Sequence, residues 1–179
     1  MATALLIVDF QNDFTPGGAL AVEGGDAIAG RVNELAASGD FELVVATRDW
    51  HPADHGSFTG QGGPWPVHCV QDTPGAELHP ALERANVDVV VDKGQDPGTE
   101  GYSGFDATPL EDLLRERAIE EVVVVGLATD YCVKNTALDA VRRGFAVSVD
   151  RAAVRGVDVE AGDSARALAE MEKAGVSVL

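Results

Sequence analysis

The stretch Val122–Gly144, VVVVGLATDYCVKNTALDAVRRG, contains a complete strand, turn and helix. Its four consecutive valines form an unbroken apolar run, which is typical of a strand buried on both faces of a parallel sheet. After the turn, apolar residues recur at helical spacing and share one face: Val133, Ala137, Ala140 and Val141. The glycine that ends the stretch is a common helix stop. This pattern predicts one strand–helix unit of an α/β protein.

The same unit recurs on both sides of this stretch. Further continuous apolar runs occupy residues 4–8, 43–47, 87–91 and 145–149, and a short VSVL run ends the chain. Helical patterns lie between them: Ile28, Val32, Leu35 and Ala36; Leu110, Leu113 and Leu114; and Ala161, Ala165, Leu168 and Met171. Alternation of this kind predicts a three-layer α/β/α fold with a mostly parallel sheet. We expect residues 1–179 to form a single domain.

One interval, at about residues 48–87, interrupts the alternation, and within it only Leu78–Arg84 could be helical. A loop of this length in a compact domain is usually functional or disordered. Its Trp, Pro and His content argues against disorder. We therefore expect an ordered functional insertion.

Composition narrows the range of partners. The formal charge of −17 over 179 residues disfavours nucleic acid and anionic membranes, which would be repelled, and favours a small-molecule substrate. The N-terminal apolar run breaks at Asp9, too early for a signal peptide or a membrane span, so a cytoplasmic protein is expected. Cys69 and Cys132 are expected to be free thiols. The sequence leaves the oligomeric state open, a homo-oligomer included.

Chemically reactive residues follow four of the apolar runs: Asp9, Asp49, Lys93 and Cys132. In open parallel sheets, ligands bind beyond the carboxyl ends of the strands, so these positions predict a site. Taken singly, each has an ordinary structural explanation: a cap or turn for the acids, a solvated charge for Lys93, and core packing for Cys132.

Lys93 and Cys132 carry the most specific expectations. A lysine that ends a buried strand needs a counter-charge, and Asp9 is the candidate. Cys132 follows a turn that begins a helix near Thr129 or Asp130, where the helix terminus would stabilise a thiolate and free N–H groups would donate hydrogen bonds to an oxyanion. A nearby carboxylate and ammonium favour a nucleophile over an inert buried thiol.

The loop carries possible metal ligands. Asp49 and His51 are two residues apart, so both side chains point the same way if the backbone is extended. His68 would add a third ligand and His55 a less certain fourth. Mixed oxygen and nitrogen ligands suit Zn²⁺, Fe²⁺ or Mn²⁺. The alternative is that these imidazoles only hold the loop in place, which is the role expected for His79.

Four segments together resemble the nicotinamidases and pyrazinamidases of the isochorismatase-like cysteine hydrolase superfamily. They are VDFQNDFTPGGAL with Asp9; TRDWHPADHGSF and WPVHCV in the loop; DKGQDPGTEGYSGF with Lys93; and VVVVGLATDYCVKNTALDA with Cys132. The resemblance runs nearly from end to end, in the family's order. It implies the isochorismatase-like hydrolase fold and a cis peptide between Leu127 and Ala128.

The resemblance also implies a reaction and a set of roles. Nicotinamide, with pyrazinamide as a close analogue, would be hydrolysed through a Cys132 thioester, assisted by Asp9 and Lys93. The oxyanion would lie on the backbone N–H groups of Ala128 and Cys132. One divalent metal ion, held by Asp49, His51, His68 and less certainly His55, would orient the pyridine ring. The substrate contacts would be Phe14, Trp65 and Tyr102.

Three other functions compete with this interpretation. A different amidohydrolase or isochorismatase of the superfamily would generally lack the full metal loop. A catalytically silent metal-binding protein would be expected to lack part of the Asp, Lys and Cys set. A nucleotide-binding Rossmann domain would carry G-x-G-x-x-G after the first strand, where this chain has DFQNDFTPGG.

Overall fold

The computed structural model describes all residues from 1 to 179 and contains one six-stranded sheet. The strands are β1 (Ala2–Val8), β2 (Leu43–Asp49), β3 (Val89–Lys93), β4 (Ile119–Leu127), β5 (Ala146–Arg155) and β6 (Ser177–Val178). Their order is β3-β2-β1-β4-β5-β6, and every ladder is parallel. Every predicted apolar run overlaps one of these strands, which confirms the parallel sheet.

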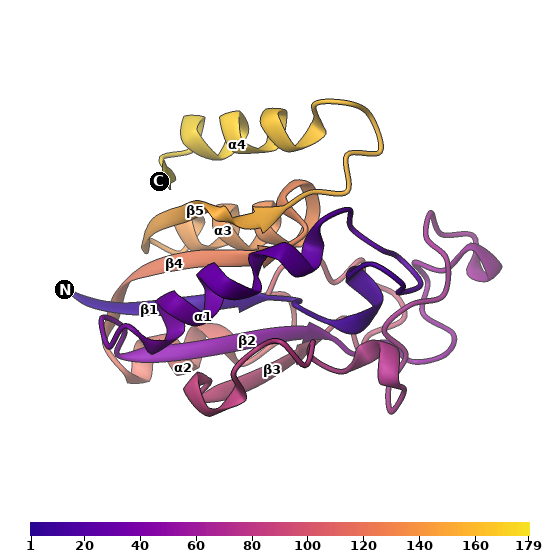
Figure 1. Ribbon diagram of the computed structural model, residues 1–179, viewed down its shortest axis with the longest axis horizontal. Helices are drawn as coiled ribbons and strands as arrows, with labels where there is room; N and C mark the ends of the chain where they lie inside the picture. The colour runs from indigo at the N-terminus through magenta and orange to yellow at the C-terminus, as the bar shows by residue number, and fades with distance from the viewer.

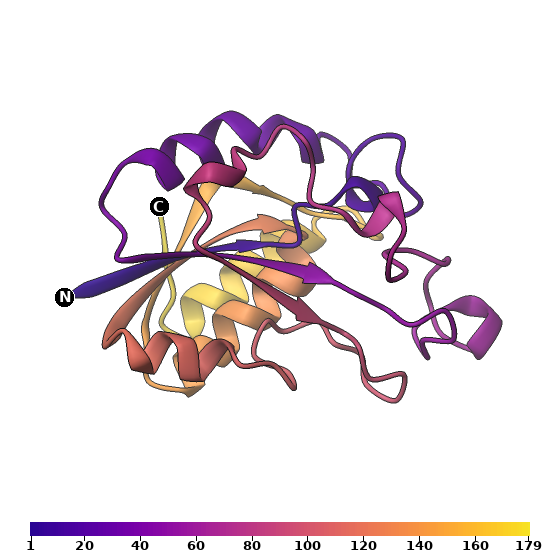
Figure 2. The same cartoon turned by 90° about the horizontal axis from the view of Figure 1, so that it is seen from below.

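Four α-helices cover the two faces of the sheet: α1 (Ala29–Ala37), α2 (Leu110–Glu116), α3 (Lys134–Arg142) and α4 (Asp163–Lys173). Helix α1 lies on one face, and the other three lie on the opposite face (Figures 1 and 2). The alternation of β1 accounts for this, because Leu5 packs in the same core as Val32 of α1, whereas Leu6 packs in the core that contains Leu114 of α2. No helix is both long enough and apolar enough to cross a bilayer.

The last helix buries only part of the face predicted for it: Leu168 and Met171 pack against the core, whereas the two alanines do not. Helix α4 begins at Asp163, so Ala161 lies outside it, and Ala165 is exposed. The fully buried residues are Ala167, which was not predicted, and Met171, which was. These two are four positions apart and share a helix face, and the large Met171 side chain gains more from burial than the methyl group of an alanine.

The possible helix at Leu78–Arg84 does not form. Leu78 instead makes an isolated antiparallel bridge with Gln11, and the His79 N–H donates to Phe10 O at 2.8 Å. Backbone groups that bond to another segment in this way are not available for helical bonds. Only a single 3₁₀ turn follows, at Arg84–Asn86.

The sheet topology places a binding crevice at the carboxyl edge of the sheet, beside the central strand β1. From β1 the chain proceeds to β2 and β3 on one side, and then returns to β4 on the other side of β1. Such a switch point opens a crevice beyond the carboxyl ends of the strands. The segment between β2 and β3 projects beyond that same edge (Figure 1). The predicted site residues therefore meet there.

Candidate active site

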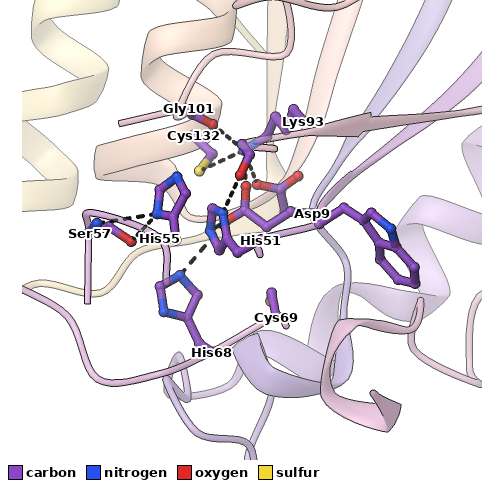
Figure 3. Close-up of polar contacts among 12 residues, drawn as sticks. Asp9, His51, His55, Ser57, His68, Cys69, Lys93, Gly101 and Cys132 are labelled. Atoms are coloured by element: carbon purple, nitrogen blue, oxygen red, sulfur yellow. Dashed lines mark hydrogen bonds and ion pairs between the residues drawn. The ribbon is translucent and has the colours of Figure 1, made fainter. Parts of the chain in front are cut away.

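Lys93, the last residue of β3, lies at the centre of a buried polar cluster (Figure 3). Its Nζ is 2.8 Å from Asp9 Oδ2 and 2.6 Å from Asp49 Oδ1. It also donates to Gly101 O at 2.9 Å and lies 3.5 Å from Cys132 Sγ. The expected pairing of Lys93 with Asp9 is confirmed, and a second carboxylate, that of Asp49, shares the ammonium.

Asp9 is held by the backbone just after β1. Its φ of 47° lies in the left-handed region, which Asp tolerates better than most residues. Its N–H donates to Thr47 O at 3.1 Å, and its Oδ1 accepts from Thr47 Oγ1 at 2.8 Å. Both contacts come from β2, so the neighbouring strand fixes the direction of this carboxylate.

Cys132 lies in a short π-helical turn, Thr129–Val133, that leads from β4 into α3. The N–H groups of Tyr131 and Val133 both donate to Ala128 O at 3.1 Å. The peptide bond between Leu127 and Ala128 is cis, as the resemblance implies. The predicted helix start near Thr129 is therefore confirmed, but its first turn is wider than an α-helical turn.

Burial and the attraction between opposite charges act in opposite directions on the pKa values of this cluster. Burial raises the pKa of the Asp9 carboxyl, although Lys93 opposes the shift. Burial lowers the pKa of Lys93, but the attraction of Asp49 and Asp9 outweighs it and holds that pKa well above its ordinary value. Burial raises the pKa of Cys132 well above its ordinary value, against the attraction of Lys93. Burial and the neighbouring carboxylates therefore oppose the thiolate that the helix terminus was expected to stabilise, and Lys93 favours it.

A second group of polar atoms lies beside this cluster. Ligand atoms of Asp49, His51 and His68 all lie within 4.8 Å of one another, and all three residues are buried. Asp49 Oδ2 is 3.2 Å from His51 Nε2 and 3.9 Å from His68 Nε2. Asp49 thus presents Oδ2 to the imidazoles and Oδ1 to Lys93.

The hydrogen bonds of the two imidazoles show that this group fits a divalent metal ion. His51 Nδ1 lies 2.7 Å from Gly94 O, and His68 Nδ1 lies 2.8 Å from Pro66 O. A carbonyl oxygen only accepts, so Nδ1 must donate in both rings and Nε2 of the neutral rings carries a lone pair. These lone pairs face a carboxylate oxygen, an arrangement that a cation between them would satisfy.

His55 lies beside this group but outside the set of ligand atoms that lie within 4.8 Å of one another. Its ring packs on His51 with centroids 4.0 Å apart, and its Nδ1 accepts from the Ser57 N–H at 3.2 Å. The same Nδ1 lies 2.7 Å from Ser57 Oγ, and the buried Nε2 has no hydrogen-bond partner. The fourth imidazole, His79, stacks on Phe10 at 5.1 Å, as expected of a structural residue.

A pocket of about 440 Å³, its open mouth included, connects the two groups. The three residues predicted to contact the substrate line it: Phe14, Trp65 and Tyr102. Trp65 Nε1 donates to the Tyr102 hydroxyl at 3.0 Å, which fixes the two rings relative to each other. Cys132, Ala128 and the Asp49 group line the same pocket.

Sequence reasoning missed two residues of this region. Tyr131 also lines the pocket and meets Trp65 edge-to-face at 5.0 Å. Gln11 is fully buried; its amide nitrogen donates to Asp49 O and Ala76 O, and its amide oxygen accepts from the Asp49 N–H, each at 2.8 Å. Gln11 lies two residues after Asp9, but nothing in the local pattern indicates a partner 38 positions away.

The site combines a thiol, an ammonium and carboxylates, buried at the switch point of a parallel sheet beneath an aromatic pocket. These features are typical of an α/β enzyme that acts on a small molecule. The isochorismatase domain model matches residues 3–179. The chain belongs to the isochorismatase family.

Relatives within the family are similar over nearly their whole length. A nicotinamidase/pyrazinamidase of Mycobacterium tuberculosis is 47% identical, with 98% of this chain and 97% of that protein covered. A pyrazinamidase of Pyrococcus horikoshii, solved in complex with zinc, is 46% identical with a TM-score of 0.92, and the match covers 100% of this chain and 99% of the other. PnC1 of L. infantum, solved in complex with nicotinate, is 38% identical with a TM-score of 0.94, and 99% and 92% are covered.

Proposed function

We propose that this chain is an amidohydrolase that converts nicotinamide into nicotinate and ammonia. The observation that carries the proposal is the position of the Cys132 thiol, which lies 3.5 Å from Lys93 Nζ at the wall of a pocket that also contains the Asp49, His51 and His68 group. The names of the relatives supply the substrate class. Pyrazinamide, in which a second ring nitrogen replaces a carbon, would fit the same pocket.

The first half of the reaction forms a thioester. Asp9 takes the proton from Cys132 Sγ, so the site moves a proton internally and gains no net charge. The thiolate attacks the carboxamide carbon, and the N–H groups of Ala128 and Cys132 receive the oxyanion, each with a contribution of roughly 3 kcal/mol. Asp9 then donates its proton to the departing nitrogen, and ammonia leaves.

The second half releases the acid. Asp9, ionised again, takes a proton from a water molecule that attacks the thioester carbon. The carbonyl re-forms, Cys132 leaves as a thiolate and recovers the proton through Asp9, and the acid departs as nicotinate after it loses the second water proton to solvent. Lys93 stays charged throughout and stabilises whichever of Asp9 and Cys132 is ionised.

The pocket fixes the substrate for this attack. Phe14, Trp65 and Tyr102 would hold the flat ring, and the hydrogen bond between the last two makes the slot rigid. Asp49, His51 and His68 would hold one divalent transition metal ion, with Zn²⁺, Fe²⁺ and Mn²⁺ as the candidates. Such an ion would supply a Lewis-acid contact to the ring nitrogen and so orient the ring.

An ammonia-release assay on nicotinamide and pyrazinamide tests the proposal, with elemental analysis of the same sample. We expect the wild-type protein to release ammonia from both amides and Cys132→Ala to release none. Cys69→Ala is the matched control, because it removes the other free thiol, which does not line the pocket. Full turnover by Cys132→Ala would refute the thiol mechanism, and no turnover of either amide by the wild-type protein would refute the substrate assignment.

A further inference from the structure

The surroundings of the Lys93 ammonium have the composition of a metal site. Four potential ligands converge on Nζ: Asp9 Oδ2 at 2.8 Å, Asp49 Oδ1 at 2.6 Å, Gly101 O at 2.9 Å and Cys132 Sγ at 3.5 Å. The ligand atoms of the two acids and the thiol lie within 4.8 Å of one another, and all three residues are buried. Carboxylates and a thiolate are ligands that Zn²⁺ and similar ions bind in proteins.

Asp49 joins this site to the proposed metal group. Its Oδ2 faces His51 and His68, while its Oδ1 contacts the ammonium. A single carboxylate that presents one oxygen to each of two neighbouring cations is the arrangement found in two-metal centres. Here one of the two cation positions contains a lysine side chain.

We propose that Lys93 fills a latent divalent-cation site and thereby keeps a second metal ion away from the Cys132 thiol. The cluster without Lys93 holds two buried carboxylates with no positive charge, and a buried charge without a partner is strongly unfavourable. A divalent ion would remove that imbalance. It would also occupy the Sγ lone pairs that the proposed reaction needs.

The geometry explains why this protection matters and what would change without it. Zinc–oxygen bonds are about 2.0–2.2 Å and zinc–sulfur bonds about 2.3 Å, so the ligands would move inward by roughly 1 Å around an ion. Loss of the Lys93 side chain opens the space for this contraction. The neighbouring metal group shares Asp49, and the Lys93 ammonium contacts both this carboxylate and the Cys132 thiol.

Cadmium binding tests the proposal, because a Cd²⁺–thiolate bond gives an ultraviolet charge-transfer band that carboxylate and imidazole ligands do not give. Metal-free Lys93→Ala is dialysed against excess Cd²⁺, and the bound metal is counted by elemental analysis. We expect two ions per chain and the thiolate band, which Lys93→Ala/Cys132→Ser should lack. Lys93→Leu is the matched control, since it removes the charge but fills the space; it should bind one ion and show no band.

Cadmium binding to the wild-type protein is a second measurement, which does not depend on the folding of any Lys93 variant. The wild-type protein should bind one Cd²⁺ per chain in excess metal and show no thiolate band. A band in the wild-type protein that Cys132→Ser lacks would overturn the proposal, as would a folded Lys93→Ala protein that binds only one ion. None of these measurements uses turnover, so a failure of the proposed amidase activity would be seen separately.

Discussion

Gln11 is the residue whose replacement most directly tests how the site is held together. The Gln11 side chain makes two hydrogen bonds to the main chain of Asp49: it accepts one from the Asp49 N–H and donates one to Asp49 O. It donates a third to Ala76 O, and all three bonds are 2.8 Å long. The residue is fully buried, so no water can replace these partners. Gln11→Met keeps the volume and removes all three hydrogen bonds.

The expected loss follows from the number of bonds. Each buried hydrogen bond contributes about 1 kcal/mol net, so Gln11→Met should lower the free energy of unfolding by about 3 kcal/mol. For a chain of this length that corresponds to a melting temperature lower by roughly 6–12 °C. Urea unfolding in the presence of a chelator measures this without a contribution from bound metal.

A neighbouring amide provides the control for this prediction. Asn12 Nδ2 donates to Pro74 O at 2.8 Å in an exposed position, so water can take its place. Asn12→Ala should therefore cost less than about 1 kcal/mol. If Gln11→Met is no more destabilising than Asn12→Ala, the buried network does not hold Asp49 as we describe.

Three further predictions concern the pocket. His68→Ala should weaken binding of the metal ion by more than about 100-fold in a competition with a chelator, whereas His79→Ala, outside the pocket, should leave binding unchanged; equal affinities would remove His68 from the ligand set. The rate at which iodoacetamide alkylates Cys132 in the metal-free protein should still rise with pH above pH 9, because burial raises the thiol pKa well above its ordinary value and the reactive thiolate forms only at high pH. A rate that reaches its plateau below pH 8 would contradict this. Tyr102→Phe removes the hydrogen bond to Trp65 and should raise KM for nicotinamide about fivefold in steady-state kinetics, with kcat little changed; an unaltered KM would show that this bond does not shape the slot.

Much of the fold could be predicted because its signals are local. A continuous run such as Val122–Val125 is long enough and apolar enough to indicate a buried strand without knowledge of its neighbours. The errors occurred where tertiary contacts decide. Leu78 pairs with Gln11, which ends any helix there, and the face of α4 is set by the burial of Met171 rather than by the alanines at 161 and 165.

The site residues also divide into those that local sequence signals predict and those that only tertiary contacts reveal. Asp9, Lys93 and Cys132 could be placed together because each follows a strand, and the exits of parallel strands meet at one edge. Gln11 could not be identified, because its partners are main-chain groups far along the chain. The direction of the shift in the Cys132 pKa could not be predicted from the helix terminus and Lys93, because burial and the charges of Asp9 and Asp49 act on the same sulfur.

The two oxygens of Asp49 bear on how the metal assignment can be tested. The sequence suggests Asp49→Ala as the natural test of the metal group, since the residue opens the D-x-H motif. The structure shows that the same change also removes the 2.6 Å partner of Lys93 and so disturbs the charge around Cys132. Lost activity in that variant would therefore fit either loss of the metal ion or a disturbed arrangement of Lys93 and Cys132. His68 contacts only the Oδ2 side of the carboxylate, so its replacement separates the two effects.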